Sequence, residues 1–346
     1  MKIAVDAMGS DNSPDVEIEG AVHASLNSDI HVILVGDEAL LSKKLAGYPR
    51  RGSISIRPAT QCIGMHEQPV MAVRNKKNSS MLVAMRLVKE GEAAAVVSAG
   101  NTGAVMVAAR TVLGPIRGVA RSAISQTLPT IRGRVVMLDL GANVDCTTRQ
   151  LCEFAEMGIA YSRYALGVES PRVGLLNIGE EGQKGGAVAR EVHQTLSSAR
   201  HMNFVGNVEP KAVYEGKADV VVCDGFIGNL FLKTSEAAAF FMGKMLREQF
   251  ESSSMNKLGA VLASKALRDL KQRVDPNEYH GAPLLGINGT VIILHGSSTA
   301  RGVENAIYGA KIAVNTHLND HIRENINRLR QHEMVAPPPE EDAESD

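Results

Sequence analysis

Short runs of apolar residues, rich in Val, Ile and Leu, recur along the whole chain. Most are continuous rather than alternating, which is typical of strands covered on both faces of a parallel sheet. The pattern predicts strands over residues 2–5, 30–35, 53–57, 93–97, 134–140, 172–178, 219–223 and 290–295.

Stretches with helical spacing of apolar positions separate many of these strands. The first helix is expected to start at Ser13, a candidate N-cap followed by Pro14 and by acidic residues in the first turn. Further helices are expected over about 78–90, 103–113, 148–167, 186–199, 229–250 and 299–318. This alternation predicts an α/β fold, namely a three-layer α/β/α sandwich around a mostly parallel sheet with right-handed crossovers.

The rhythm changes near residues 250–275, where two helical patterns follow each other without a strand. The apolar positions near one helical face are Met255, Leu258, Val261, Leu262 and Leu270. The basic positions around them are Lys257, Lys265, Arg268, Lys271 and Arg273. Such a stripe suits a dimer contact, a core helix or an anionic membrane surface. We expect one large α/β domain over 1–335, with a helical protrusion at about 250–275, and a disordered acidic tail over 336–346.

Composition narrows the class of protein. The 346 residues are enough to bury a large core, while a formal net charge of −1 and an aromatic content of 4% argue against bulk nucleic-acid binding. The 4 cysteines form no Cys-x-x-Cys pair and no metal-ligand spacing with histidine, which indicates idle thiols in a reducing compartment. No apolar signal core opens the chain, and no run approaches the ~20 residues that span a bilayer, so we expect a cytoplasmic protein.

Glycine-rich turns with polar neighbours follow six of the predicted strands. They read "AVDAMGSD", "VVSAGNTGA", "MLDLGANVD", "LLNIGEEGQKGG", "VVCDGFIGNLFLK" and "IILHGSST". Ligands bind where the strands of open α/β sheets end, and helix N-termini and glycine amides suit anions such as phosphate. We therefore expect several of these turns to converge on an anion-binding crevice. For any single turn, ordinary turn chemistry remains the alternative explanation.

The usual signatures of nucleotide and acyl-enzyme sites are missing from the sequence. It contains no Gly-x-Gly-x-x-Gly after the first strand, no Gly-x-x-x-x-Gly-Lys-Ser/Thr and no Gly-x-Ser-x-Gly. No cysteine stands beside a histidine. The chain thus offers places for anions without an obvious covalent nucleophile, a metal cluster or a cofactor motif. A consistent hypothesis is that the bound anion is itself the nucleophile.

Eight motifs, in order over about residues 1–320, resemble the bacterial acyl-acyl-carrier-protein:phosphate acyltransferases of phospholipid synthesis. They are "AVDAMGSD", "AVRNKKNSSM", "SAGNTGA", "LPTIRG", "LDLGANVD", "LLNIGEEGQKG", "VVVCDGFIGN" and "HGAPLLGINGTVIILHGSS". The resemblance implies transfer of a fatty acyl group from acyl carrier protein to inorganic phosphate by a homodimer. It also implies a fold similar to isocitrate and isopropylmalate dehydrogenases and to phosphotransacetylases. We expect no metal or organic cofactor, because the sequence contains no ligand cluster or nucleotide fingerprint. The chain departs from the family's usual residues at Ser10, Ser122, Ile227 and His280.

Such an enzyme must hold a phosphate dianion against a thioester and stabilise an oxyanion with fixed donors. A thiol leaves readily, so strong general-acid help is not essential. The candidate catalytic residues are Asn101, Lys184, Asp224, Asn229 and His295. Lys184 is the expected phosphate ligand, or else a solvated loop lysine, and the asparagines are expected oxyanion donors. His295 would donate to phosphate or sulfur, and Asp224 would orient donors, because a carboxylate repels phosphate.

Further residues are candidates for binding phosphate or the acyl carrier. They are Asp6, Gly9, Arg74, Lys77, Gly100, Thr102, Gly103, Asn143, Gly225, Gly228 and Ser297. Two basic clusters, one with Arg74, Lys76 and Lys77, are candidate docking surfaces for the acidic carrier, or else solvated faces. The second comprises Arg117, Arg121, Arg132 and Arg134.

Two other functions stay open at this point. One is a decarboxylating dehydrogenase on the related fold, although no convincing metal-binding carboxylate cluster or nicotinamide loop is found. The other is a non-catalytic regulator that binds anions or carrier protein. For the acyltransferase, the basic apolar stripe suggests weak contact with the inner face of the membrane, near a membrane-bound acyltransferase that consumes acyl phosphate.

Overall fold

An 11-stranded sheet runs through the protein in the computed structural model, which describes residues 1–335. Across the sheet the strands are β3 (Ile54–Pro58), β2 (His31–Gly36), β1 (Lys2–Asp6), β4 (Ala95–Ser98), β11 (Thr290–Ile293), β10 (Ala282–Leu285), β5 (Ala123–Thr130), β6 (Gly133–Leu138), β9 (Val220–Val222), β7 (Arg172–Leu176) and β8 (Asn203–Val208).

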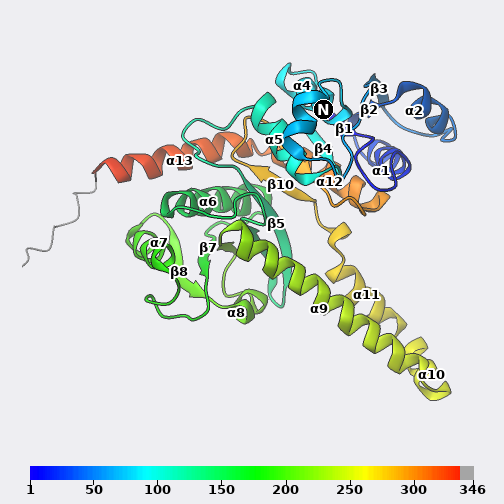
Figure 1. The fold of residues 1–346 in the computed structure, drawn as a ribbon. Helices are drawn as coiled ribbons and strands as arrows, with labels where there is room; N and C mark the ends of the chain where they lie inside the picture. The colour runs from blue at the N-terminus through cyan, green and yellow to red at the C-terminus, as the bar shows by residue number, and fades with distance from the viewer. Residues whose placement is uncertain (336–346) are drawn as a thin grey trace, which may run out of the picture.

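Helices cover both faces of this sheet (Figure 1). They are α1 (Asp15–Leu26), α2 (Glu38–Leu45), α3 (Pro69–Asn75), α4 (Ser80–Lys89), α5 (Thr102–Val112), α6 (Thr148–Ala160), α7 (Ala187–Ser198), α8 (Pro210–Glu215), α9 (Gly225–Glu251), α10 (Ser254–Leu262), α11 (Ser264–Val274), α12 (Ala300–Asn315) and α13 (Leu318–Val335). A π-helical turn at Tyr161–Ala165 continues α6, and a 3₁₀ turn covers Pro276–Glu278. The predicted three-layer α/β/α sandwich is confirmed.

Both faces of the strands are buried, which explains why the apolar runs are continuous. In β1, Ala4 packs on the side of α4 and α5, while Ile3 and Val5 pack on the side of α1 and α12. In the other half of the sheet, Val136 packs with α6, and its neighbour Met137 packs on the opposite face. Successive side chains of a strand point to opposite faces, so a strand between two helical layers needs apolar residues at every position.

The sheet consists of two parallel halves that run in opposite directions. Strands β3, β2, β1, β4 and β11 are parallel to one another, as are β6, β9, β7 and β8. Between the halves, the pairs β11–β10, β10–β5 and β5–β6 are all antiparallel. The carboxyl ends of the two halves therefore face opposite edges of the sheet.

This topology divides the glycine-rich turns into two groups. The register aligns Leu138 of β6, through Ser125 and Pro283, with Ile292 of β11. Three strand spacings, or about 14 Å, separate these two strand ends. Beyond them the chains leave in opposite directions. The turns after β1, β4 and β11 form one group, and those after β6, β7 and β9 form the other.

A helical arm extends from the second half (Figure 1). Helix α9 has 27 residues, or about 40 Å at 1.5 Å per residue, and α10 and α11 follow it in the segment where two successive helices were expected. Large apolar side chains are exposed along the arm, including Phe240, which is 74% exposed, and Leu262, which is 80% exposed. Within residues 1–335, no helix is both long and apolar enough to cross a membrane.

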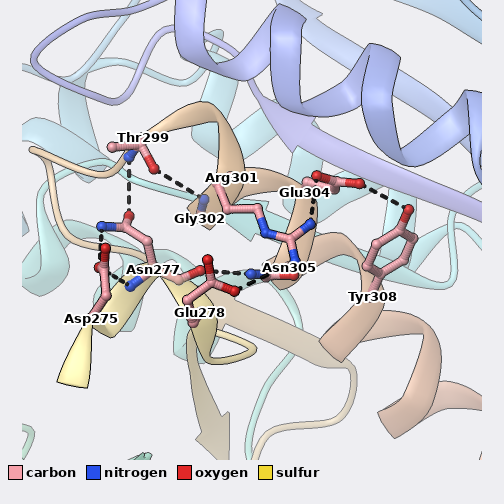
Figure 2. A network of polar contacts seen from close by, with 9 residues as sticks. All are labelled: Asp275, Asn277, Glu278, Thr299, Arg301, Gly302, Glu304, Asn305 and Tyr308. Atoms are coloured by element: carbon pink, nitrogen blue, oxygen red, sulfur yellow. Dashed lines mark hydrogen bonds and ion pairs between the residues drawn. The ribbon is translucent and has the colours of Figure 1, made fainter. Parts of the chain in front are cut away.

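The return from the arm is anchored to the first half through Asn277 (Figure 2). Its carbonyl oxygen accepts from Asn305 Nδ2 at 2.7 Å, and its Oδ1 accepts from the Thr299 amide at 3.1 Å. Arg301, in the first turn of α12, forms an ion pair with Glu278 at 3.4 Å. The arm therefore begins in one half of the molecule and is fastened to the other.

Candidate active site

Helix α9 begins against the turn that follows β6. The Asp224 side chain caps the helix, accepting from the Ile227 amide at 2.8 Å. The Gly225 amide donates to the Asn143 carbonyl at 2.7 Å, and the Gly228 amide bonds to the Asp224 carbonyl. These two glycine amides are thus occupied within the protein. What the glycines provide is close packing, since added Cβ atoms would meet Asn143 and Asp139.

Asp139 organises this turn, and the sequence did not single it out. It is fully buried and accepts from the amides of Ile124 at 3.0 Å, Ala142 at 3.1 Å and Asn143 at 2.7 Å. Burial raises the pKa of Asp139, while the hydrogen bond from the Asn143 side chain and those from the amides counteract the shift. The available signal was its place as the first acid of "LDLGANVD", at the very end of a strand.

The two asparagines beside this turn differ in what they can offer a ligand. Asn143 Nδ2 donates to the Ser122 carbonyl at 2.8 Å and to Asp139 at 2.9 Å, so its side-chain donors are engaged. Asn229 is exposed in the first turn of α9, beside Gly141, and its side chain makes no hydrogen bond within residues 1–335. Of these two amides, only that of Asn229 is available to a substrate.

Lys184 lies on the loop 177–186, which follows β7. Asn177 Nδ2 donates to the Lys184 carbonyl at 3.0 Å, and the Lys184 amide donates to the Glu181 carbonyl at 3.0 Å, so the loop closes on itself. The Lys184 side chain is exposed and forms no ion pair within the described part of the chain. Its neighbour Gly185 has a φ of +87°, a left-handed conformation that favours glycine.

A cavity of about 720 Å³ adjoins both the loop and the start of α9. Its lining comes from β5, the end of β7, the loop 177–186, α7, α8, α9 and the segment 274–279. Leu230 and Gly185 are among the lining residues, so the cavity reaches the immediate neighbours of Asn229 and Lys184 in the chain. We call it the apolar groove.

The other group of turns is built around the buried Asp6. This carboxylate accepts from Ser98 Oγ at 2.8 Å, and burial raises its pKa. Gly9 packs on Gly100, because a Cβ on Gly9 would lie 2.8 Å from the Gly100 amide nitrogen. That amide donates to Ser98 Oγ at 3.2 Å. Glu17 is also buried nearby, and burial raises its pKa to about 7.

Asn101 has a structural task in this group. Its Oδ1 accepts from the Ala104 amide at 3.0 Å, capping α5, and its Nδ2 donates to the carbonyls of Met65 at 2.9 Å and Glu67 at 3.0 Å. No side-chain N–H is left to stabilise an oxyanion. The amides of Thr102 and Gly103, in the first turn of α5, have no hydrogen-bond acceptor within the part of the chain described.

His295 and Ser297 follow β11 in the same group. His295 is exposed, and its Nδ1 lies 2.7 Å from Ser297 Oγ. The topology thus divides the candidate residues into two groups. The first, the Asp6 group, consists of Asp6, Gly9, Gly100, Asn101, Thr102, Gly103, His295 and Ser297. The second, the Asn229 group, consists of Asn143, Lys184, Asp224, Gly225, Gly228 and Asn229.

The basic clusters also divide. Arg74 and Lys77 are exposed at the end of α3, which packs against α5, whereas Lys76 forms an ion pair with Glu67 at 2.6 Å. Arg121 and Arg132 lie beyond opposite ends of the 8-residue strand β5, about 26 Å apart. The four arginines expected to form a second cluster therefore do not form one surface.

Comparison with known proteins establishes the family. A family model described as "Fatty acid synthesis protein" matches residues 1–321. The phosphate acyltransferase of Geobacter sulfurreducens is 48% identical over 325 residues, covering 94% of each chain. The chain belongs to the phosphate acyltransferase family. The relative from Pelotomaculum thermopropionicum is 46% identical over 329 residues, covering 95% of this chain and 96% of its own.

Solved structures of low sequence identity share the fold. A phosphotransacetylase from Streptococcus pyogenes matches with a TM-score of 0.59 at 18% identity, covering 94% of each chain. The EutD phosphotransacetylase from Staphylococcus aureus matches with a TM-score of 0.58 at 17% identity, covering 90% of this chain and 94% of its own. Membership of the phosphate acyltransferase family makes the chain an acyltransferase, and decides against both the dehydrogenase and the non-catalytic regulator.

Proposed function

We propose that this acyltransferase moves a fatty acyl group from acyl carrier protein to inorganic phosphate, and that the acyl phosphate enters phosphatidic acid synthesis. The observation that carries the proposal is the free amide of Asn229 and the unpaired ammonium of Lys184, both beside the apolar groove. The phosphate anion is matched by Lys184, the developing oxyanion by Asn229 and the fatty chain by the apolar groove.

In this mechanism a phosphate oxygen attacks the thioester carbonyl carbon, and the carbonyl oxygen becomes an oxyanion. When the intermediate collapses, the C–S bond breaks, the carrier leaves as a thiolate and the acyl–phosphate bond remains. Lys184 holds the phosphate and offsets the repulsion between it and the carbonyl oxygen. Asn229 donates to the oxyanion, and no covalent enzyme intermediate is needed.

The other residues of the Asn229 group act through position. Asp224 caps α9 and fixes the helix turn that carries Asn229. Asp139 and Asn143 hold the turn onto which that helix start packs. In the Asp6 group, the donors that make no hydrogen bond within residues 1–335 include the Thr102 and Gly103 amides, which suit a second anion. Arg74 and Lys77, on the adjacent α3, suit the acidic surface of the carrier by electrostatic steering.

The assay compares an acyl carrier thioester with and without phosphate, at matched ionic strength. Hydroxylamine traps acyl phosphate as a hydroxamate, and a thiol reagent counts the carrier released. We expect hydroxamate and free carrier in equal amounts, and both only with phosphate. Thioester loss at the same rate without phosphate would show a hydrolase instead.

We also propose that the enzyme is a homodimer that touches anionic membrane at the inner face. The apolar side chains exposed on α9 suit a second copy, while those on α10 lie at the far end of the arm, among basic residues. Release of a lipid-like product near the bilayer would bring it to the membrane-bound acyltransferase that consumes it.

A further inference from the structure

The apolar groove is longer than a site for the reacting atoms requires. Along α9 its lining runs from Ile227 to Ala239, twelve residues farther on, and Tyr279 also lines it. At 1.5 Å per residue, this stretch of helix is about 18 Å long. A fatty chain in one leaflet spans about half of the ~30 Å hydrocarbon core, or ~15 Å. The groove therefore has the length of a membrane fatty acyl chain.

The walls of the groove present apolar surface. Leu128 of β5 and Leu176 of β7 are buried members of the core and line the groove, and Phe231 stacks on Tyr214 with ring centroids 5.5 Å apart. Two of the polar side chains in the lining have partners of their own. Ser235 Oγ donates to the Phe231 carbonyl at 2.7 Å, and Glu236 pairs with Lys233 at 2.8 Å.

We propose that the apolar groove binds the fatty acyl chain of the substrate, with its carbonyl end at Asn229 and its methyl end near Ala239. This inference rests on the proposed acyl transfer and deepens it. The groove adjoins the Asn229 group through Ile227 and Leu230, and its volume of about 720 Å³ lies within the usual range of ligand pockets. Each methylene withdrawn from water strengthens binding about four-fold, so the filled length sets chain preference.

Two neighbouring alanines of α9 provide a matched test. Ala239 lines the groove, whereas Ala237 does not, and both are exposed on the same turn. Phenylalanine at position 239 would block the far end of the groove, while at position 237 it would lie outside. Because both positions tolerate a large side chain at the surface, neither variant is expected to unfold the protein.

The experiment measures kcat/KM for butanoyl and hexadecanoyl carrier thioesters. Ala239→Phe should lower kcat/KM for the hexadecanoyl thioester by about tenfold or more, because a few methylenes of the long chain can no longer bind in the groove. The butanoyl value should stay unchanged, because the short chain does not reach position 239. Ala237→Phe should leave both values unchanged. Equal effects of the two variants on both substrates would overturn the proposal.

Two further readouts separate the remaining outcomes. Light scattering reports the assembly: a change of mass in Ala239→Phe with an unaltered chain-length profile would assign the groove to a second copy of this chain and overturn the proposal. Binding of a fluorescent fatty acid is independent of turnover. If the wild type forms no acyl phosphate, acyl transfer fails, and weakened binding in Ala239→Phe alone still supports the groove.

Discussion

A Cβ atom added to Gly228 would lie 1.9 Å from the carbonyl oxygen of Asp139. This contact seats the first turn of α9 directly on the turn after β6 and sets the position of Asn229, the next residue. The glycine is helical and not left-handed, so closeness of approach is what excludes a side chain. A stability requirement and the proposed catalytic role of Asn229 thus meet in a single turn.

The first prediction is that Gly228→Ala destabilises the protein by about 1–3 kcal/mol, because overpacking a buried contact forces the backbone to move. The matched control is Gly243→Ala, farther along α9, where an added Cβ meets nothing within 4 Å. Alanine there should stabilise the helix by up to about 1 kcal/mol. Thermal unfolding of both variants checks the pair, and equal melting temperatures would contradict the packing argument.

A second prediction concerns Asn229. Its side chain is exposed and unbonded within residues 1–335, so Asn229→Ala removes a donor without leaving a partner unpaired. Loss of one oxyanion donor lowers kcat by about 10²-fold or more, with little change in the KM for phosphate. Asn256→Ala, at the tip of the arm, is the control and should leave kcat unchanged. A folded Asn229→Ala variant with wild-type kcat would remove Asn229 from the mechanism.

Lys184 carries the third prediction. If its ammonium holds phosphate, Lys184→Ala should chiefly raise the KM for phosphate, and Lys184→Arg should recover part of the loss. Lys217 pairs with Glu180 at 2.9 Å, so Lys217→Ala is a control of equal charge change close to the same loop. Initial rates over a series of phosphate concentrations give the KM values. Equal KM values in the two alanine variants would show that Lys184 acts only through its charge and does not bind phosphate directly.

The sequence predicted the strands of both parallel halves except β8, but it did not predict how the two halves are joined. The strand β5, "AISQTLPT", carries Gln and Thr among its apolar residues, and β10 has only four residues, so neither showed as a continuous apolar run. These two strands reverse the direction of the second half. Without them, several of the glycine-rich turns were expected to converge on one crevice.

At the site, too, contacts between segments far apart in the sequence decide what a residue can do. Asn101 and Asn229 look alike in sequence, since each is an asparagine beside glycine at a helix start. In the fold, Asn101 meets the carbonyls of Met65 and Glu67, whereas Asn229 meets no acceptor within residues 1–335. Such contacts come from distant segments, and local pattern does not contain them. The predicted tail, 336–346, lies outside the described residues.

The fourth prediction is a pH dependence of stability through Glu17. Its pKa is raised by burial from 4.5 to about 7, so between these values the folded state binds more protons than the unfolded chain. Stability should therefore fall as the pH rises through this window. Glu17→Gln keeps a neutral side chain and should be more stable than wild type at about pH 8, by up to about 3 kcal/mol.

Urea unfolding at about pH 5 and about pH 8 checks this for both proteins. Burial also raises the pKa of the neighbouring Asp6. Asp6 is present in both proteins, so its contribution to the pH dependence of stability cancels to first order. Parallel pH profiles for wild type and Glu17→Gln would show that Glu17 does not carry the effect.

The last prediction concerns the tip of the arm. In α10, Met255 is 76% exposed, Leu258 55% and Leu262 80%, and no residue of the helix is buried. Exposed apolar side chains flanked by lysine and arginine bind anionic lipid through both burial and charge. Wild type should therefore co-sediment with vesicles containing anionic lipid, less so with added salt, and hardly with neutral vesicles.

Acidic substitutions on the apolar side of α10 separate a membrane contact from a dimer contact. Leu258→Glu and Leu262→Glu should abolish vesicle binding while the mass in solution and the turnover of carrier thioester persist. Ile131→Glu is the matched control, because Ile131 is 76% exposed, close to the 80% of Leu262, but lies in the β5–β6 turn, away from the tip. Dissociation of the dimer by the tip variants would instead make the stripe an interface between copies, since a buried glutamate without a partner disrupts such a contact.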